Sequence, residues 1–103
     1  QEKMQELQFI EQTLNNLIMQ KYVFQMELSE TESALSEIEK AGDEVFKVIG
    51  QLMIKTEKVK VKEDLANKRK LIELRLKSLE KQETSLSSKL EELRNQIMSE
   101  MNK

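Results

Sequence analysis

The side chains best suited to acid–base chemistry in this sequence are glutamates that recur three residues apart, such as Glu27 with Glu30 and Glu80 with Glu83. Two carboxylates can act as general acid and general base when a pocket shifts their pKa values. The 103-residue chain contains no histidine and no cysteine, which excludes a Ser-His triad, a thiol nucleophile and the common zinc sites. A rod of helices offers no pocket, so we interpret these glutamates as solvated faces. We expect no catalytic residue, no bound metal and no cofactor.

A lysine-rich run is the candidate for contact with nucleic acid or another acidic partner. Glutamates interrupt the run, no aromatic residue lies within it, and the isoelectric point of the chain is about 5.4. Nucleic-acid-binding surfaces are usually more basic and more clustered. We therefore interpret the run as a solvated strand edge and expect no nucleic-acid partner. The run comprises Lys55, Lys58, Lys60 and Lys62.

The elements that carry these residues are mostly long helices. Charged residues make up 35% of the chain and aromatic residues 4%, with two glycines and no proline, which is typical of long helices and coiled coils. The longest strongly apolar stretch, residues 48–54, is far shorter than the roughly 20 residues of a membrane span, so we expect no membrane partner. Because the first residue is Gln1, we expect that native residues precede it.

Residues 1–42 carry a heptad pattern, which predicts a coiled-coil helix. We call the stripe of a and d positions the seam. Ile18, Met19 and Met26 are expected to widen it, and Tyr22 and Phe24 are expected to be packing residues and not a nucleic-acid stacking pair. Two polar seam positions, Lys21 and Thr31, are expected to relax the pairing or to set its register. The a positions are Leu7, Leu14, Lys21, Leu28 and Leu35, and the d positions are Ile10, Leu17, Phe24, Thr31 and Ile38.

Residues 65–103 carry a second heptad pattern of similar length. The first arm has three lysines against eight glutamates, whereas the second has nine basic against six acidic residues. Opposite charge and matched length predict an antiparallel pair of helices, with both chain ends at one tip. The d positions are Leu65, Ile72, Leu79, Leu86 and Leu93, and the a positions are Arg69, Leu76, Glu83, Leu90 and Ile97.

Residues 43–64 break the helical pattern. Gly42 is expected to end the first helix in the left-handed conformation. Two short apolar runs, 45–49 and 52–56, flank Gly50-Gln51, which predicts a β-hairpin with glycine at the first central position of its turn. The alternating run 58–62 is expected to extend a strand, with Glu63 and Asp64 in the first turn of the second helix.

The predicted hairpin is apolar on both faces, which has a consequence for assembly. An isolated two-stranded hairpin is marginally stable in water, and its edges invite pairing with another chain. We therefore expect several copies to join their strands into an oligomeric β-barrel, although helix ends folding over the hairpin would also cover it. The expected oligomerisation residues are Val45, Phe46, Val48, Ile49, Gly50, Leu52, Met53 and Ile54.

The arrangement of two arms around Glu44–Lys55 (EVFKVIGQLMIK) resembles a prefoldin subunit over nearly the whole chain. A single hairpin resembles the beta type, and ALSEI at 34–38, KQE at 81–83 and LEEL at 90–93 are similar to archaeal beta subunits. The resemblance implies a cytoplasmic hexamer of two alpha-type and four beta-type subunits. It also implies that the tips hold non-native polypeptides without nucleotide and pass them to a group II chaperonin.

Such a chaperone needs adhesive residues at its tips, and this chain has them at both ends. Phe9 and Met98 fall outside the a and d pattern, and methionine adapts to irregular apolar surfaces. Leu7, Ile10 and Ile97 have an alternative interpretation, in which they only continue the seam. The expected client-binding residues are Met4, Leu7, Phe9, Ile10, Ile97, Met98 and Met101.

A structural adaptor that joins two folded partners is the alternative function. A spacer of this kind needs only a short helix–helix loop of roughly two to eight residues. The apolar hairpin therefore favours the chaperone, and its presence is the feature that separates the two hypotheses.

Overall fold

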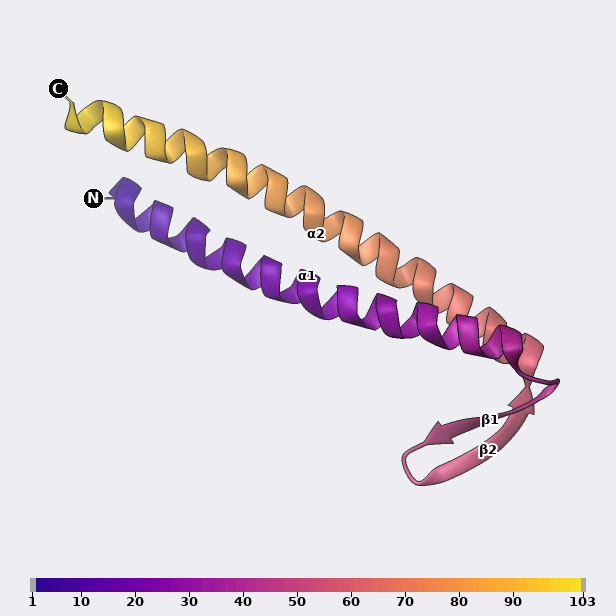
Figure 1. The fold of residues 1–103 in the computed structure, drawn as a ribbon. Helices are drawn as coiled ribbons and strands as arrows, with labels where there is room; N and C mark the ends of the chain where they lie inside the picture. Colours follow the sequence, from indigo (N-terminus) through magenta and orange to yellow (C-terminus); the bar gives the residue numbers. More distant parts are fainter. Residues whose placement is uncertain (1, 103) are drawn as a thin grey trace. The chain divides into compact units, whose positions relative to one another are not determined.

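The computed structural model describes residues 2–102 and is mainly helical, as the sequence predicts. Helix α1 spans Glu2–Lys40 and helix α2 spans Lys58–Met101. Strands β1 (Glu44–Ile49) and β2 (Leu52–Glu57) form an antiparallel hairpin between them (Figure 1). Across the described residues, no helix is long and apolar enough to span a membrane.

The chain divides into two compact units, and α1 and α2 contribute to both. The tip unit comprises residues 1–24 and 75–103, and the hairpin unit comprises residues 25–74. The start of α1 and the end of α2 both belong to the tip unit. The two units separate the residues expected to bind clients from those expected to drive assembly.

In the tip unit, the two helix segments pack along the predicted seam. Ile10, Leu14 and Leu93 form a buried cluster, with Leu7, Leu86 and Leu90 packed against it. Ion pairs join Lys3 to Glu100 and Glu11 to Arg94, so residues early in α1 lie beside residues late in α2. The segments are therefore antiparallel in this unit, as the sequence predicts.

The two polar seam positions of the tip unit lie opposite each other. Lys21 Nζ donates a hydrogen bond to Glu83 Oε2 at 3.4 Å, and their side chains are only 26% and 31% exposed. Each heptad pattern has one polar a position in this unit, and the antiparallel pairing brings the two together. A lysine and a glutamate that would each weaken an apolar seam instead satisfy one another across it.

In the hairpin unit, the heptad positions again face inward. Ile38 and Ile72 are buried, and Thr31 is 3% exposed. The Thr31 hydroxyl donates to the backbone carbonyl of Glu27 at 2.8 Å, which satisfies its polar atom inside the helix. Arg69 is the seam position that the structure places on the surface, where it pairs with Glu73.

The hairpin has the predicted turn. Ile49 pairs with Leu52 across it, so Gly50 and Gln51 form a two-residue loop. Gly50 has a φ of 60°, whereas no residue other than glycine has a positive φ in the described chain. Positive φ at the first central position alone matches a type II′ turn, whose twist suits paired strands. Glycine is favoured there because a Cβ strains this conformation.

Two predictions about the boundaries of this region were wrong. The run 58–62 is the beginning of α2 and not an extended strand. Gly42 lies in the bend after α1, but its φ is not positive, so the left-handed cap is absent there. In this region, side chains of the first two turns of α2 contact the end of α1, a long-range interaction that local patterning does not encode.

Candidate functional site: the hairpin and the helix ends

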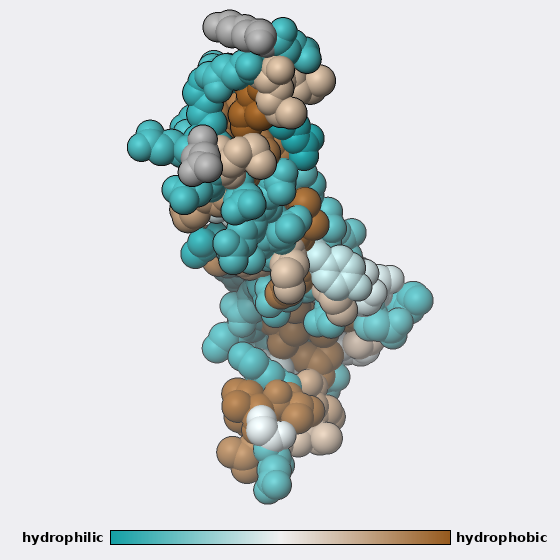
Figure 2. Space-filling view, turned by 90° about the vertical axis from the view of Figure 1, so that its left-hand side faces the viewer, coloured by the Kyte–Doolittle hydropathy of each residue, from teal (hydrophilic) through white to brown (hydrophobic). Residues whose placement is uncertain are grey.

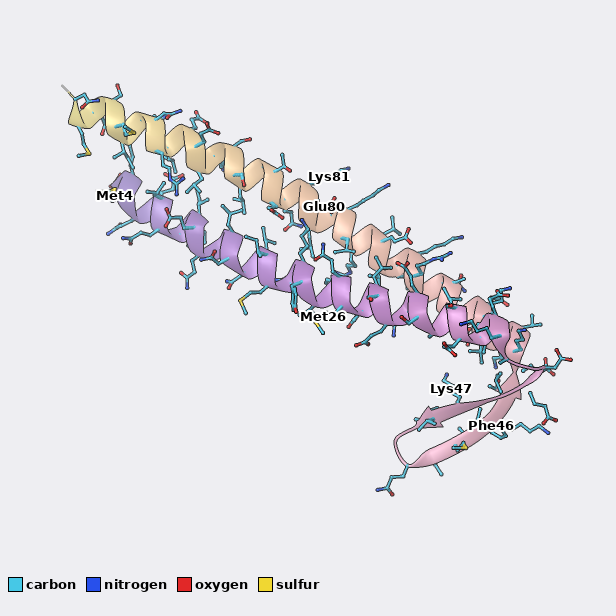
Figure 3. All side chains as sticks on the ribbon, viewed as in Figure 1. Met4, Met26, Phe46, Lys47, Glu80 and Lys81 are labelled. Carbon is cyan, nitrogen blue, oxygen red and sulfur yellow. The ribbon has the colours of Figure 1, made fainter. Side chains whose placement is uncertain are left out.

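The hairpin presents apolar side chains on both of its faces. Directly paired residues point to the same face, so Val48 lies beside Met53 while Ile49 lies beside Leu52 on the other face. Phe46 and Lys47 extend from opposite sides of the ribbon (Figure 3). The large apolar side chains exposed on the hairpin are Phe46, Val48 and Met53 on one face and Ile49, Leu52 and Ile54 on the other.

These six side chains form the most concentrated apolar surface of the hairpin unit. Figure 2 shows brown hydrophobic surface gathered at the lower end of the view, where the hairpin lies. Monomeric soluble proteins rarely expose contiguous apolar patches of this kind, and larger ones mark interaction sites. The outer edges of both strands also have unpaired backbone groups, because the sheet contains only β1 and β2.

The base of the hairpin differs from the rest. Val45 is only 9% exposed, and its partner across the ladder, Thr56, is half-buried. Beside them, Lys55 pairs with Glu44 at 2.9 Å on the opposite face. Val45 is thus covered within the chain itself, whereas the other predicted assembly residues remain open. Gly50 contributes through the turn and not through a contact surface.

The helix ends carry a second set of exposed apolar side chains. Met4, Phe9 and Met98 are exposed, and Met101 is 80% exposed. Figure 3 shows Met4 near the beginning of α1. These residues lie in the tip unit, together with the Lys3–Glu100 ion pair that joins the two helix ends. They lie outside the seam, so neither helix needs them for packing against the other.

The remaining predicted tip residues belong to the seam. Ile10 is 4% exposed and lies at the centre of the buried cluster. Leu7 packs against that cluster, and Ile97 is half-buried at the next seam position along α2. Of the two interpretations open for these three residues, the structure supports continuation of the seam. The exposed tip surface therefore comprises Met4, Phe9, Met98 and Met101.

A further apolar surface on α1 was missed by the sequence analysis. Ile18, Met19, Tyr22 and Val23 are all at least half exposed. At 3.6 residues per turn Met19, Tyr22 and Val23 lie on the face of the helix that is turned away from Leu14 and Leu17, and Ile18 lies at the edge of that face, next to Leu14. Met19 does not widen the seam, whereas Ile18 borders it beside Leu14, and the prediction that Tyr22 packs was wrong. We call these four residues the outer-face surface. Their i, i+1, i+4, i+5 spacing was the available signal.

The carboxylates occupy surface positions or ion pairs. A hydrogen bond from Lys62, reinforced by its charge, lowers the pKa of Glu39 below its usual range. Lys3 lowers the pKa of Glu100 in the same way. Glu83 binds Lys21, and Glu80 lies exposed on α2 (Figure 3). Within residues 2–102, no group of three acidic side chains converges as a metal site would require.

Comparison with known proteins gives a consistent picture. The whole chain, residues 1–103, matches the family model described as "Prefoldin subunit". It is 43% identical over 94 residues to "Prefoldin subunit beta" of Thermococcus onnurineus, covering 89% of this chain and 81% of the relative. Identity to the protein of the same name from Thermococcus kodakarensis is 42% over 96 residues, covering 91% and 82%.

A solved structure extends the similarity to three dimensions. The crystal structure of the prefoldin beta subunit from Thermococcus strain KS-1 matches with a TM-score of 0.89 and 40% sequence identity. The match covers 96% of this chain and 89% of that chain.

Proposed function

The chain belongs to the prefoldin subunit family, and we propose that it is a beta-type chaperone subunit that holds unfolded polypeptides without ATP. The observation that carries the proposal is the pair of exposed apolar surfaces in separate units. The hairpin surface drives assembly, and the tip surface holds the client. Each surface is left open by the packing of this chain alone.

Assembly through the hairpin joins this chain to other prefoldin subunits. In the proposed hexamer, four copies of this chain and two alpha-type subunits pair their strands, which removes the unpaired edges. Closure of the barrel buries one of the two apolar faces of each hairpin in its interior, since inward and outward residues alternate along a strand. The two faces are Phe46, Val48 and Met53 on one side and Ile49, Leu52 and Ile54 on the other. The proposed setting is the cytoplasm, with a group II chaperonin receiving the client.

Client binding at the tips depends on several weak contacts made together. Phe9 supplies a large apolar ring, and the methionines supply flexible side chains that fit irregular surfaces. One subunit offers a small surface, but several arms that engage one chain raise the effective concentration and hence the avidity. This arrangement suits clients of no fixed sequence, because no single contact has to be specific.

The outer-face surface extends the proposed client contact along α1. Its four side chains are exposed, apolar and outside the seam, as the tip residues are. The only formal charge between Gln12 and Phe24 is that of Lys21, which is paired with Glu83. An uncharged apolar strip favours apolar segments of a non-native chain over charged folded surfaces. Replacing Met19 and Tyr22 with serine should weaken client capture less than replacing the tip residues.

The decisive experiment separates the two surfaces. Light scattering follows aggregation of a chemically unfolded model protein, with this chain and an alpha-type subunit present and nucleotide absent. A tip variant replaces Met4, Phe9, Met98 and Met101 with serine, and a control variant replaces Gln5, Gln8, Asn95 and Gln96, which are exposed at the same helix ends. We expect the parent and the control to suppress aggregation near stoichiometric amounts, and the tip variant to fail.

The state of assembly must be measured beside the activity. Size-exclusion chromatography with light scattering should show that the tip variant assembles as the parent does. Loss of assembly in the tip variant would contradict the division between the two surfaces. An assembled parent that leaves aggregation unchanged would contradict the chaperone function, and would favour the adaptor that joins two folded partners.

A further inference from the structure

The hairpin is attached to its two helices in different ways. β2 ends at Glu57 and α2 begins at Lys58, so this strand runs into the helix without a linker. β1 is joined to α1 through Ala41, Gly42 and Asp43. Gly42 is exposed, and a Cβ built on it would meet nothing within 4 Å. Packing around Gly42 therefore does little to hold this second connection.

The end of α1 is capped largely by α2, because within its own sequence only the amide of Ala41 donates back, to the carbonyl of Ile38 at 3.2 Å. The last carbonyl groups of a helix have no partner inside it, and they carry the negative end of the helix dipole. Lys58 Nζ donates hydrogen bonds to the carbonyl oxygens of Ala41 at 3.0 Å and of Glu39 at 3.3 Å. The backbone amide of Lys58 also donates to the carbonyl of Asp43 at 3.3 Å. A single residue thus contacts both sides of the bend.

One turn further along α2, Lys62 reinforces this contact. Its ammonium group forms an ion pair with the carboxylate of Glu39, whose backbone carbonyl accepts from Lys58. Lys58 and Lys62 are four residues apart and lie on one face of α2, so both reach the last turn of α1. The lysine-rich run is thus helical from its second lysine onward, and Lys58 and Lys62 both contact the end of α1.

We propose that Lys58 is a positioning residue, which latches the base of the hairpin to the end of α1 and so presents the strands for assembly with partner subunits. The proposal rests on the function inferred above. Without the Lys58 side chain, only the backbone hydrogen bond from Lys58 to Asp43 and the Lys62–Glu39 ion pair hold the bend, so the paired strands pivot more freely relative to the end of α1. Each hairpin must then be ordered at the moment of pairing, and this ordering weakens association. With the latch, the orientation is set before partners meet.

The test compares three substitutions in the full chain. Lys58→Met keeps the aliphatic stem but removes the donor and the charge, and Lys58→Arg keeps both. Lys60→Met is the matched control, because Lys60 is exposed on the same turn of α2. We expect Lys58→Met to weaken co-assembly with an alpha-type subunit by roughly three- to tenfold. Lys58→Arg should restore it, and Lys60→Met should leave it unchanged.

A second measurement on the isolated chain tests the latch without any partner. Hydrogen–deuterium exchange of the amides at 41–49 should be faster in Lys58→Met than in the parent and in Lys60→Met, with the helix content by circular dichroism unchanged. Equal exchange and equal co-assembly in parent and Lys58→Met would overturn the latch. A parent that fails to assemble with the alpha-type subunit, while its exchange still depends on Lys58, would overturn the proposed function and leave the latch standing.

Discussion

The helical seam and the β-hairpin both bring apolar side chains together, but they leave them in different states. In the seam, leucine and isoleucine side chains at a and d positions of α1 pack against those of α2. The polar seam residue Lys21 forms an ion pair with Glu83. In the hairpin, Val48 lies beside Met53 and both remain exposed. Packing within the chain covers the apolar side chains of the seam, but it leaves most of those on the hairpin exposed.

This difference shows where the chain depends on a partner. Antiparallel helices each have one apolar stripe, so two of them suffice to cover both stripes. A two-stranded sheet has two faces and two edges, and its own strands cover none of the faces. The substitutions below should therefore change the stability of the isolated chain in the seam, but mainly its assembly in the hairpin.

The largest effect is expected from a cavity in the seam. Leu14→Ala removes a buried side chain from the cluster with Ile10 and Leu93, and it should lower the free energy of unfolding by about 3 kcal/mol. Phe9→Ala, on an exposed position of the same helix, should change it by less than about 0.5 kcal/mol. Thermal unfolding followed by circular dichroism measures both. Similar losses would show that the seam is not the core of the tip unit.

A smaller effect is expected at the hairpin turn, where two glycines give a matched pair. Gly50→Ala places a Cβ at a φ of 60° and should destabilise the turn by about 1 kcal/mol. Gly42→Ala should be neutral or stabilising, because its φ is not positive and the space around it is open. Exchange protection of the β1–β2 amides reports the effect. A larger loss of protection from Gly42→Ala would contradict this account of the bend.

The polar pair in the seam should contribute about 0.5–1 kcal/mol of coupling, since both side chains are partly exposed. Lys21→Glu and Glu83→Lys should each destabilise the chain, because each places like charges across the seam. The double variant restores opposite charges and should recover much of the loss. A double-mutant cycle on urea unfolding measures the coupling. Additive losses would mean that the two side chains do not interact.

The smallest effect is expected on acidification. The folded-state pKa values of Glu39 and Glu100 lie below the ordinary value of 4.5, owing mainly to hydrogen bonds from Lys62 and Lys3. A lowered pKa contributes stability above the unfolded value, and that stability is lost as pH falls through the folded value. Lys62→Met should remove the Glu39 part of this dependence. Titration of the glutamate carboxyl carbons by NMR checks it, and an unshifted Glu39 would contradict the ion pair.

Much of this fold could be predicted, because long repeats average over local ambiguity. Five heptads in each arm fixed which residues face the partner helix, and only Arg69 departed from the pattern. The glycine turn was equally clear, since few residues favour positive φ. The start of α2 was not clear, because Lys-Val-Lys-Val-Lys fits a strand by alternation and a helix by the contacts of Lys58 and Lys62. The side-chain contacts of the two lysines span 17 or more residues of the chain.

The functional surfaces were predicted unevenly for a related reason. Met4, Phe9, Met98 and Met101, which were placed at the tips outside the seam, are exposed as a client-binding role requires, whereas Met19 was expected to widen the seam and is exposed as well. Tyr22 was assigned to packing from its residue type, which suggested burial. Its position on the helix places it away from the seam, and this position determines that it is exposed. A check of each apolar residue against the heptad register would have identified the outer-face surface.

The antiparallel pairing also orders events during synthesis of the chain. Glu39 and Lys62 are close in the sequence, so both are synthesised early and can form their ion pair early. Glu83 is synthesised 62 residues after Lys21, and Glu100 is synthesised 97 residues after Lys3. Loop closure becomes less favourable as the intervening chain lengthens. Contacts between α1 and α2 are therefore expected to form first beside the hairpin and last near the ends of the chain. The contacts that close last, such as Lys3 with Glu100, lie at the helix ends, where Met4, Met98 and Met101 are exposed.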